Sequence, residues 1–201
     1  MNQNADTLAS RLDTFRTEVA RLDNTAIIDR FLNTEAPVCI SREQETALKR
    51  ALANNYRIEA RDVLMVGSGK LGFTLVSKPQ RPQFSHFSDQ SDIDVALISK
   101  SLFEQYWTAA FEYHAANGPW DEFSSFRKYV FKGWIRPDML PTSEDFPLFK
   151  EWVEFFQELQ ASGKYGGYKI AAGIYHSEFF CNQYIGKALN ACRSAIQGQG
   201  L

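Results

Sequence analysis

The chain has 201 residues, of which 44% are hydrophobic and 23% are charged, a balance typical of a globular protein with a sizeable buried core. The formal net charge of −2 excludes a broad basic field, so non-specific binding to duplex nucleic acid is not the expected main function. No run of about 18 apolar residues occurs, and the first residues lack an apolar signal segment. A cytoplasmic protein without a membrane partner is therefore expected.

The first 60 residues carry the patterns of helices. Apolar side chains recur every three or four positions from residue 5 to residue 32, and the polar segment 23–25 is a candidate break between two helices. Pro37 ends this region, and Ser41 followed by Gln44 forms a capping box that predicts a further helix to about residue 55. We expect residues 1–60 to pack on a core formed by residues 61–201, so that the chain is one compact unit.

Three apolar segments in the rest of the chain predict strands, at residues 61–66, 91–99 and 168–175. Helices are predicted at residues 101–116, 121–132, 147–159 and 178–196. Two prolines in the insertion at residues 76–90 prevent a continuous helix there. The order of these elements predicts an α/β or α+β fold, with a small mixed sheet flanked by N-terminal and C-terminal helices.

Aromatic residues make up 14% of the chain, and cysteines are few. The ordinary role of the rings is to fill a core, since a base-stacking platform would need them interleaved with Lys and Arg on one surface. Cys39, Cys181 and Cys192 lack the spacing of metal ligands, so buried thiols in a reducing compartment are expected.

The segment VLMVGSGKLG at residues 63–72 fits parts of three phosphate-binding motifs. A P-loop is excluded because Lys70 is followed by Leu71 instead of the Ser or Thr that binds magnesium. The Rossmann fingerprint needs a helix directly after the glycines, and the prolines of the insertion leave room for about one or two turns. We therefore interpret Gly67 and Ser68 as a turn after a buried strand, whose backbone N–H groups and hydroxyl suit a triphosphate.

The segment Ser91-Asp92-Ile93-Asp94 opens the second predicted strand. Asp92 and Asp94 are separated by one residue and project to the same side of a strand, while Ile93 points into packing. Two adjacent carboxylates repel each other unless a cation offsets their charge, and oxygen ligands suit Mg²⁺ or Mn²⁺ with triphosphate oxygens completing the shell. Solvated aspartates on an edge strand are the alternative, which the Gly-Ser turn after the preceding strand disfavours.

The combination of Val66-Gly67-Ser68 with Ser91-Asp92-Ile93-Asp94-Val95 resembles the nucleotidyltransferase superfamily related to DNA polymerase beta, in its small, minimal branch. The resemblance covers residues 61–99, and the rest only by element order. It implies that Asp92 and Asp94 bind two Mg²⁺ ions, and that Gly67 and Ser68 hold a nucleoside triphosphate. Lys70 and Ser91 are further candidate cofactor-binding residues. The resemblance also implies transfer of a nucleoside monophosphate to an acceptor, which is a protein, an RNA or a nucleotide, with release of pyrophosphate.

One departure from the superfamily pattern bears on activity. Many active members carry a third carboxylate on a later strand, and the predicted strand at residues 168–175 contains none. Glu178, just beyond that strand, is the nearest candidate, although the start of a helix is also an ordinary place for a glutamate. The alternative function is a catalytically weak module, an antitoxin, sensor or regulator with a toxin or effector as protein partner, because small members include antitoxins and proteins of antiviral defence.

Further basic residues leave alternatives open. Lys70 is expected either to contact the triphosphate or to be solvated, and the insertion at residues 76–90 is either a lid or acceptor contact, or a tolerated surface insertion. An RNA acceptor is disfavoured by the net charge, yet several cations are candidates for a local basic patch: Lys78, Arg81, Arg127, Lys128, Lys132 and Arg136.

Overall fold

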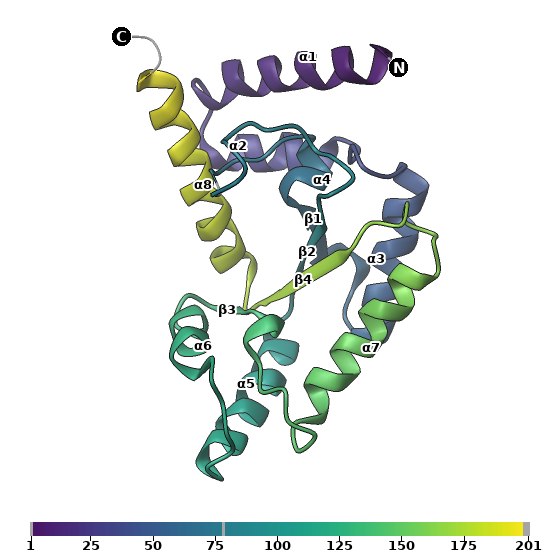
Figure 1. The fold of residues 1–201 in the computed structure, drawn as a ribbon. Coiled ribbons are helices and arrows are strands. Elements are labelled where there is room, and N and C mark those ends of the chain that lie inside the picture. The colour runs from purple at the N-terminus through teal and green to yellow at the C-terminus, as the bar shows by residue number, and fades with distance from the viewer. Residues whose placement is uncertain (1, 78, 199–201) are drawn as a thin grey trace.

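The computed structural model describes residues 2–77 and 79–198, and within them four strands form one mixed sheet in the order β1-β2-β4-β3. β1 (Val63–Val66) is antiparallel to β2 (Ile93–Ile98), and β2 is parallel to β4 (Ile170–Tyr175). The short strand β3 (Trp134–Ile135) is antiparallel to β4. The predicted mixed α/β fold class is confirmed, and Figure 1 shows the helices arranged around this small sheet.

The helices before the sheet begin and end close to the predicted positions. α1 (Asn2–Val19) and α2 (Asn24–Ile28) are separated at the predicted break, where the Asp23 side chain accepts a hydrogen bond from the Ala26 N–H at 2.8 Å. The chain continues from α2 into a π-helix, η1 (Asp29–Thr34), which the sequence pattern does not predict. Ser41 and Gln44 form the predicted capping box at the start of α3 (Arg42–Tyr56).

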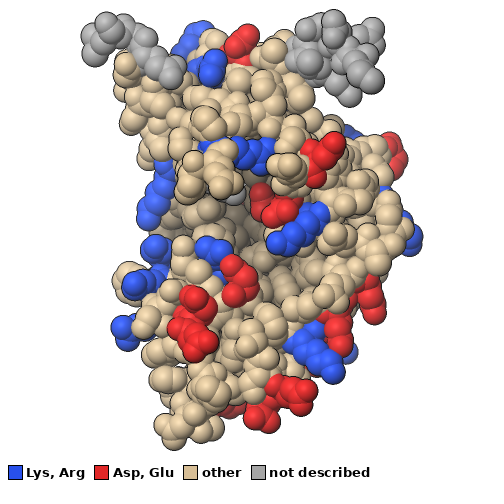
Figure 2. All heavy atoms as spheres, viewed as in Figure 1, with Lys and Arg blue, Asp and Glu red and all other residues tan. Residues whose placement is uncertain are grey.

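The remaining elements alternate with the strands. They are the helices α4 (Gly67–Leu71), α5 (Lys100–Ala115), α6 (Phe123–Val130), α7 (Pro147–Ala161) and α8 (Glu178–Gly198), with 3₁₀ turns η2 (Ala60–Asp62) and η3 (Pro137–Met139). β4 crosses the middle of the view in Figure 1, and the surface is hollowed there, with acidic and basic side chains around the hollow (Figure 2). None of the helices in the described part of the chain combines the length and apolar character needed to cross a bilayer.

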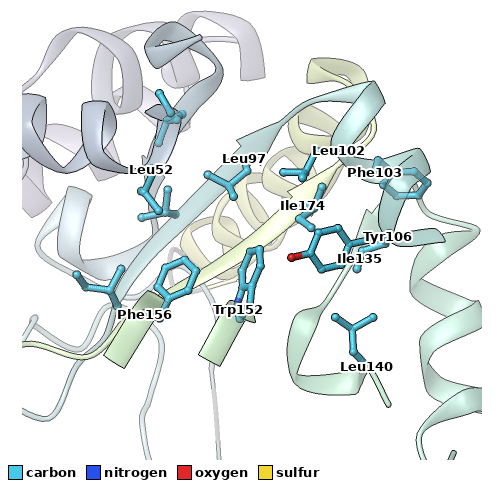
Figure 3. Packing of buried hydrophobic residues seen from close by; sticks show 14 of the residues in the cluster. Leu52, Leu97, Leu102, Phe103, Tyr106, Ile135, Leu140, Trp152, Phe156 and Ile174 are labelled. Carbon is cyan, nitrogen blue, oxygen red and sulfur yellow. The ribbon is translucent and has the colours of Figure 1, made fainter. Parts of the chain in front are cut away.

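One face of the sheet packs against α3, α5 and α7. From β2, Ile93, Val95 and Leu97 are at most 3% exposed, which confirms the prediction that they point into packing. Figure 3 shows Trp152 and Phe156 of α7 in the same layer, below Leu97 and the β4 residue Ile174. Helices α5 and α7 thus cover the sheet face opposite the two aspartates.

The other face packs against the N-terminal helices and α8. Phe15 of α1 is fully buried, and its ring lies 5.3 Å from Phe31 and 4.9 Å from Phe73, measured between ring centroids. Arg193 of α8 donates hydrogen bonds to the carbonyl oxygens of Val19 and Leu22, each at 2.7 Å. The first helix is therefore joined to the sheet and to the last helix through one hydrophobic cluster.

We predict that Phe15→Ala lowers the free energy of unfolding of the whole chain by about 3–5 kcal/mol, because the cavity left by a buried ring is only partly refilled. Chemical denaturation followed by circular dichroism and by tryptophan fluorescence measures the loss. Phe111→Ala is the matched control, since Phe111 is 67% exposed and its truncation should change stability by about 0.5 kcal/mol or less. A separate early transition in Phe15→Ala, with the main transition unmoved, would contradict a single compact unit.

Candidate functional site

The structure brings the glycine turn into direct contact with Asp94, the aspartate within strand β2. Val66, the last residue of β1, pairs with Asp94 of β2, and α4 begins at the next residue, Gly67. Gly67 has a φ of 68°, and a Cβ atom placed on it would overlap Oδ2 of Asp94. Glycine is therefore required here for its backbone conformation and for space. The Asp94 carboxylate lies directly against the backbone of the turn.

The backbone of Asp92 borders the same turn. Asp92 precedes β2, and its carbonyl oxygen is 3.5 Å from the position that a Cβ on Gly69 would take. Asp92 and Asp94 are both half-buried, whereas Ser68 is 9% exposed within α4. Four of the residues singled out from the sequence, Gly67, Ser68, Asp92 and Asp94, thus lie around one turn at one edge of the sheet.

Small residues of β4 form the floor beside Asp94. Ala171 is the β4 partner of Asp94 in the parallel pairing, and Gly173 is the partner of Ala96. Trp134 of β3 lies across Gly173, because a Cβ there would overlap the indole nitrogen Nε1. We call the region beside Ala171, between Asp94 and Trp134, the central hollow. Figure 2 shows the surface hollowed in the middle of the view, where Figure 1 places β4.

An aromatic wall that the sequence analysis missed closes the far side of the central hollow. The Trp134 ring stacks on Tyr175 at 5.4 Å with an angle of 9°, and it lies 4.6 Å from the half-exposed ring of Tyr184. The buried Nε1 of Trp134 has no hydrogen-bond acceptor within the described residues. Arg136 lies over the Trp134 ring at 5.6 Å and donates to Asp138 at 2.6 Å. In the sequence, the signal for this wall is the pair Trp134 and Arg136, which are separated by one residue.

The Tyr184 hydroxyl of the wall and the Cys39 thiol beside the turn both have raised pKa values. Burial raises the pKa of the Tyr184 hydroxyl, and Asp94 raises it further, while Arg136 opposes them. Burial also raises the pKa of the Cys39 thiol to about 12, and the Sγ atom of Cys39 packs beside Gly69. Tyr184 therefore remains a neutral hydrogen-bond donor near Asp94, and Cys39 is a neutral packing residue rather than a nucleophile.

Lys70 lies in the core beneath the turn. It is 1% exposed, and its Nζ donates to Oε1 of Glu45 in α3 at 2.9 Å. Burial lowers the pKa of Lys70, and Glu45 opposes that shift. Of the two alternatives for Lys70, solvation is wrong, because α3 and α1 cover this side of α4, and contact with a triphosphate stays a prediction. The ion pair with Glu45, together with the hydrogen bond from Arg11 Nη2 to the Lys70 carbonyl at 3.2 Å, anchors the turn from behind.

Ser91 braces the insertion that follows α4. It is 3% exposed, and its Oγ accepts hydrogen bonds from Nη2 of Arg81 at 2.6 Å and from the Ser88 N–H at 3.0 Å. Within the insertion, Phe84 is 8% exposed and packs against Phe73 at 6.4 Å. The described part of residues 76–90 is therefore folded onto the protein at Arg81 and Phe84, and Lys78 lies outside the described residues.

Glu178 does not join the two aspartates. It is the exposed first residue of α8, beyond the carboxyl end of β4, whereas Asp94 pairs with Ala171 at the amino end of β4. The part of β4 from Ala171 to Tyr175, which lies between Asp94 and Glu178, is alone roughly 13 Å long, at about 3.3 Å per residue. Because β2 and β4 are parallel, a residue after β4 cannot lie beside one that opens β2. The β4 residue beside Asp94 is Ala171, which carries no carboxylate.

The carboxylates of Asp92 and Asp94 suit a cation that arrives bound to a ligand better than a cation held permanently by the protein. Within residues 2–77 and 79–198, no three side chains of His, Cys, Asp or Glu gather to hold a metal ion. Mg²⁺ is commonly bound by one or two carboxylates, with phosphate oxygens and waters completing its shell. Asp92 and Asp94, beside a turn whose first residue leaves no side chain in the way, supply that set.

Comparisons of the chain with family models, with curated proteins and with solved structures found no match.

We predict that Gly67→Ala destabilises the protein more than Gly163→Ala. Gly163 has a φ of 65° and no atom within 4 Å of an added Cβ, so its substitution costs about 1–2 kcal/mol for the left-handed backbone alone. Gly67→Ala carries the same cost and must also displace Asp94, which adds about 1–3 kcal/mol. Urea denaturation of both variants measures the difference, and equal losses would show that Asp94 does not press on Gly67.

Proposed function

We propose that this protein is a Mg²⁺-dependent nucleotidyltransferase that transfers a nucleoside monophosphate from a nucleoside triphosphate to an acceptor hydroxyl. The observation that carries the proposal is the contact between the Asp94 carboxylate and the Gly67 backbone. It joins into one site the Gly-Ser turn and the Asp-x-Asp pair, which in the sequence resemble the nucleotidyltransferase superfamily.

The residues of the site have separate roles in this proposal. Asp92 and Asp94 would hold the cation that accompanies the triphosphate, which would supply positive charge to offset the negative charge of the leaving pyrophosphate. The backbone N–H groups that open α4 at Gly67 and Ser68 lack acceptors within the helix and suit phosphate oxygens. The acceptor oxygen bonds to the α-phosphorus, and the bond from that phosphorus to the bridging oxygen breaks. Pyrophosphate leaves with the electron pair, and the acceptor proton passes to water.

The aromatic wall provides a place for the nucleobase. Tyr184 is 49% exposed, and a base can stack on such a ring. The buried Trp134 Nε1 donor has no acceptor within the described residues, and an unpaired buried donor costs free energy. An oxygen or nitrogen acceptor on a bound nucleotide would remove that cost.

A second function, nucleotide binding without transfer by an antitoxin, sensor or regulatory module, is favoured by Ala171. This residue occupies the β4 position beside Asp94 and leaves the site with two carboxylates. Two carboxylates suffice to bind a metal-nucleotide complex, whereas a third would strengthen the hold on the cations during transfer.

We predict that Asp92→Asn/Asp94→Asn weakens Mg²⁺-dependent binding of a nucleoside triphosphate by about tenfold or more, because the ligands of the cation lose their charge. Calorimetry with each of the four nucleoside triphosphates measures the binding, and an assay of pyrophosphate release measures transfer. Glu144→Gln/Asp145→Asn is the matched control, since it removes two adjacent carboxylates from an exposed loop.

Three outcomes separate the two functions. Pyrophosphate release that is lost in the double aspartate variant supports transfer, and tight binding without release supports the regulatory module. Equal binding in the wild type and in the double aspartate variant, or no binding of any nucleoside triphosphate, would refute both. The melting temperature of the aspartate variant should stay within about 2 °C of the wild type, so that a loss of binding is not a loss of fold.

We predict that Ala171→Asp tightens the binding of Mg²⁺ with a nucleoside triphosphate, because it places a carboxylate next to Asp94 on the same face of the sheet. Titration of Mg²⁺ at a fixed concentration of nucleotide gives the apparent affinity. Ala171→Asn controls for the added volume without the added charge. Unchanged affinity in a folded Ala171→Asp variant would show that the cation does not lie between β2 and β4.

A further inference from the structure

A basic and aromatic surface lies beside the central hollow. The segment Arg127 to Arg136, RKYVFKGWIR, contains four cations and three aromatic residues and no acidic residue, in a chain with a net charge of −2. It runs from the end of α6 through β3. Figure 2 shows Lys and Arg side chains along the edge of the molecule where Figure 1 places α6 and α8.

The structure gathers the side chains of this segment around one exposed ring. Arg127, Lys128, Phe131 and Lys132 line an open depression of about 450 Å³. Phe131 is 89% exposed, the highest exposure among the large hydrophobic side chains in the described part of the chain. The Nζ atom of Lys132 also lies 5.0 Å from the centroid of the Tyr129 ring. We call this set the Phe131 surface.

Folding does not account for the Phe131 surface. An aromatic ring stabilises a fold when it is removed from water, and Phe131 remains in water. Cations gathered in one segment repel each other, and within the described residues Arg136 alone of the four forms an ion pair, with Asp138. A ligand that supplies both negative charge and flat apolar faces would satisfy both features.

We propose that the Phe131 surface binds single-stranded nucleic acid. Such ligands are bound by positively charged surfaces that follow the phosphates and by aromatic rings on which bases stack. Arg127, Lys128 and Lys132 contact phosphates, and a base stacks on Phe131. An acidic protein segment would match the charge but would not use the exposed ring as a stacking platform. Arg81 takes no part, since it is bonded to Ser91 in the insertion.

The Phe131 surface leads to the carboxylates. Arg136 lies over both Tyr129 and Trp134, and Trp134 lies against Gly173 of β4, two residues from Ala171, the partner of Asp94. A strand bound at Phe131 can therefore reach the central hollow with its end. This second step rests on the proposed function, and it makes the terminal hydroxyl of the bound strand the acceptor of the transferred nucleotide.

Fluorescence anisotropy with labelled single strands of RNA and of DNA tests the proposal. Strands of about 12 nucleotides lie within the roughly 4–16 nucleotides that one single-strand-binding domain covers. Phe131→Ala should raise the Kd at least about fivefold, the low end for loss of one stacked base. Lys128→Gln/Lys132→Gln should reduce the slope of log affinity against log salt by about 1.4, since each lost phosphate contact removes about 0.7.

Matched controls lie elsewhere on the surface. Phe111→Ala removes another exposed ring, on α5, and Lys100→Gln/Lys150→Gln removes two lysines that are 68% and 73% exposed. Neither control should change the Kd for the oligonucleotides. Binding of one arm more tightly than the other assigns the surface to RNA or to DNA.

Several results would overturn the proposal: no binding of either oligonucleotide, equal weakening by Phe111→Ala, or binding of anionic vesicles or poly-glutamate through Lys128 and Lys132 without binding of oligonucleotides. The two proposals fail separately. Asp92→Asn/Asp94→Asn should bind oligonucleotides as the wild type does, and Phe131→Ala should bind nucleoside triphosphate as the wild type does. If oligonucleotides bind through Phe131 but no nucleoside triphosphate binds, the proposal for the Phe131 surface stands and the proposal of a nucleotidyltransferase is refuted.

Discussion

The parallel pairing of β2 with β4 is the constraint on which the site depends. It places the amino ends of both strands at one edge of the sheet, so that Asp94 lies beside Ala171. The antiparallel pairing of β1 brings the end of that strand, and with it Gly67, to the same edge. Parallel neighbours need a long crossover, and this one contains α5, α6, β3 and α7. Three segments far apart in the chain therefore meet around one hollow.

Two further features keep this edge open and fixed. Ala171 places no bulky side chain beside Asp94, and Trp134 covers Gly173 further along β4. The buried pair of Lys70 and Glu45 holds the turn from below. Loss of one member would leave an uncompensated buried charge, which typically costs about 3–5 kcal/mol. The turn is thus rigid where it faces Asp94, and rigid donors lose little entropy when they bind phosphate.

Local signals in the sequence predicted local structure well. The capping box at Ser41, the break at Asp23 and the alternation that turns Ile93 away from the aspartates depend on neighbouring residues alone. The contacts that define the site depend on distant residues. Lys70 is buried because Glu45 of another helix meets it, and the five-residue helix α4 has too little pattern to predict its buried face. β3, with two residues, is likewise too short to show an alternation.

Glu178 and the aromatic wall show the same limit for function. Glu178 is near β4 in sequence but at the wrong end of it in space, and only the strand direction reveals this. Trp134 and Tyr184 belong to β3 and α8, whose contact follows from the sheet order.

The central claim is that a metal-bound nucleotide lies between the α4 turn and the amino ends of β2 and β4. Mn²⁺ added with a nucleoside triphosphate, followed by paramagnetic broadening of backbone amide signals, tests it directly. We expect strong broadening at Gly67, Ser68 and Ala171, with Gly118 in the loop after α5 unaffected. Broadening that spares Gly67 and Ala171, or that appears without the nucleotide at another place, would contradict it.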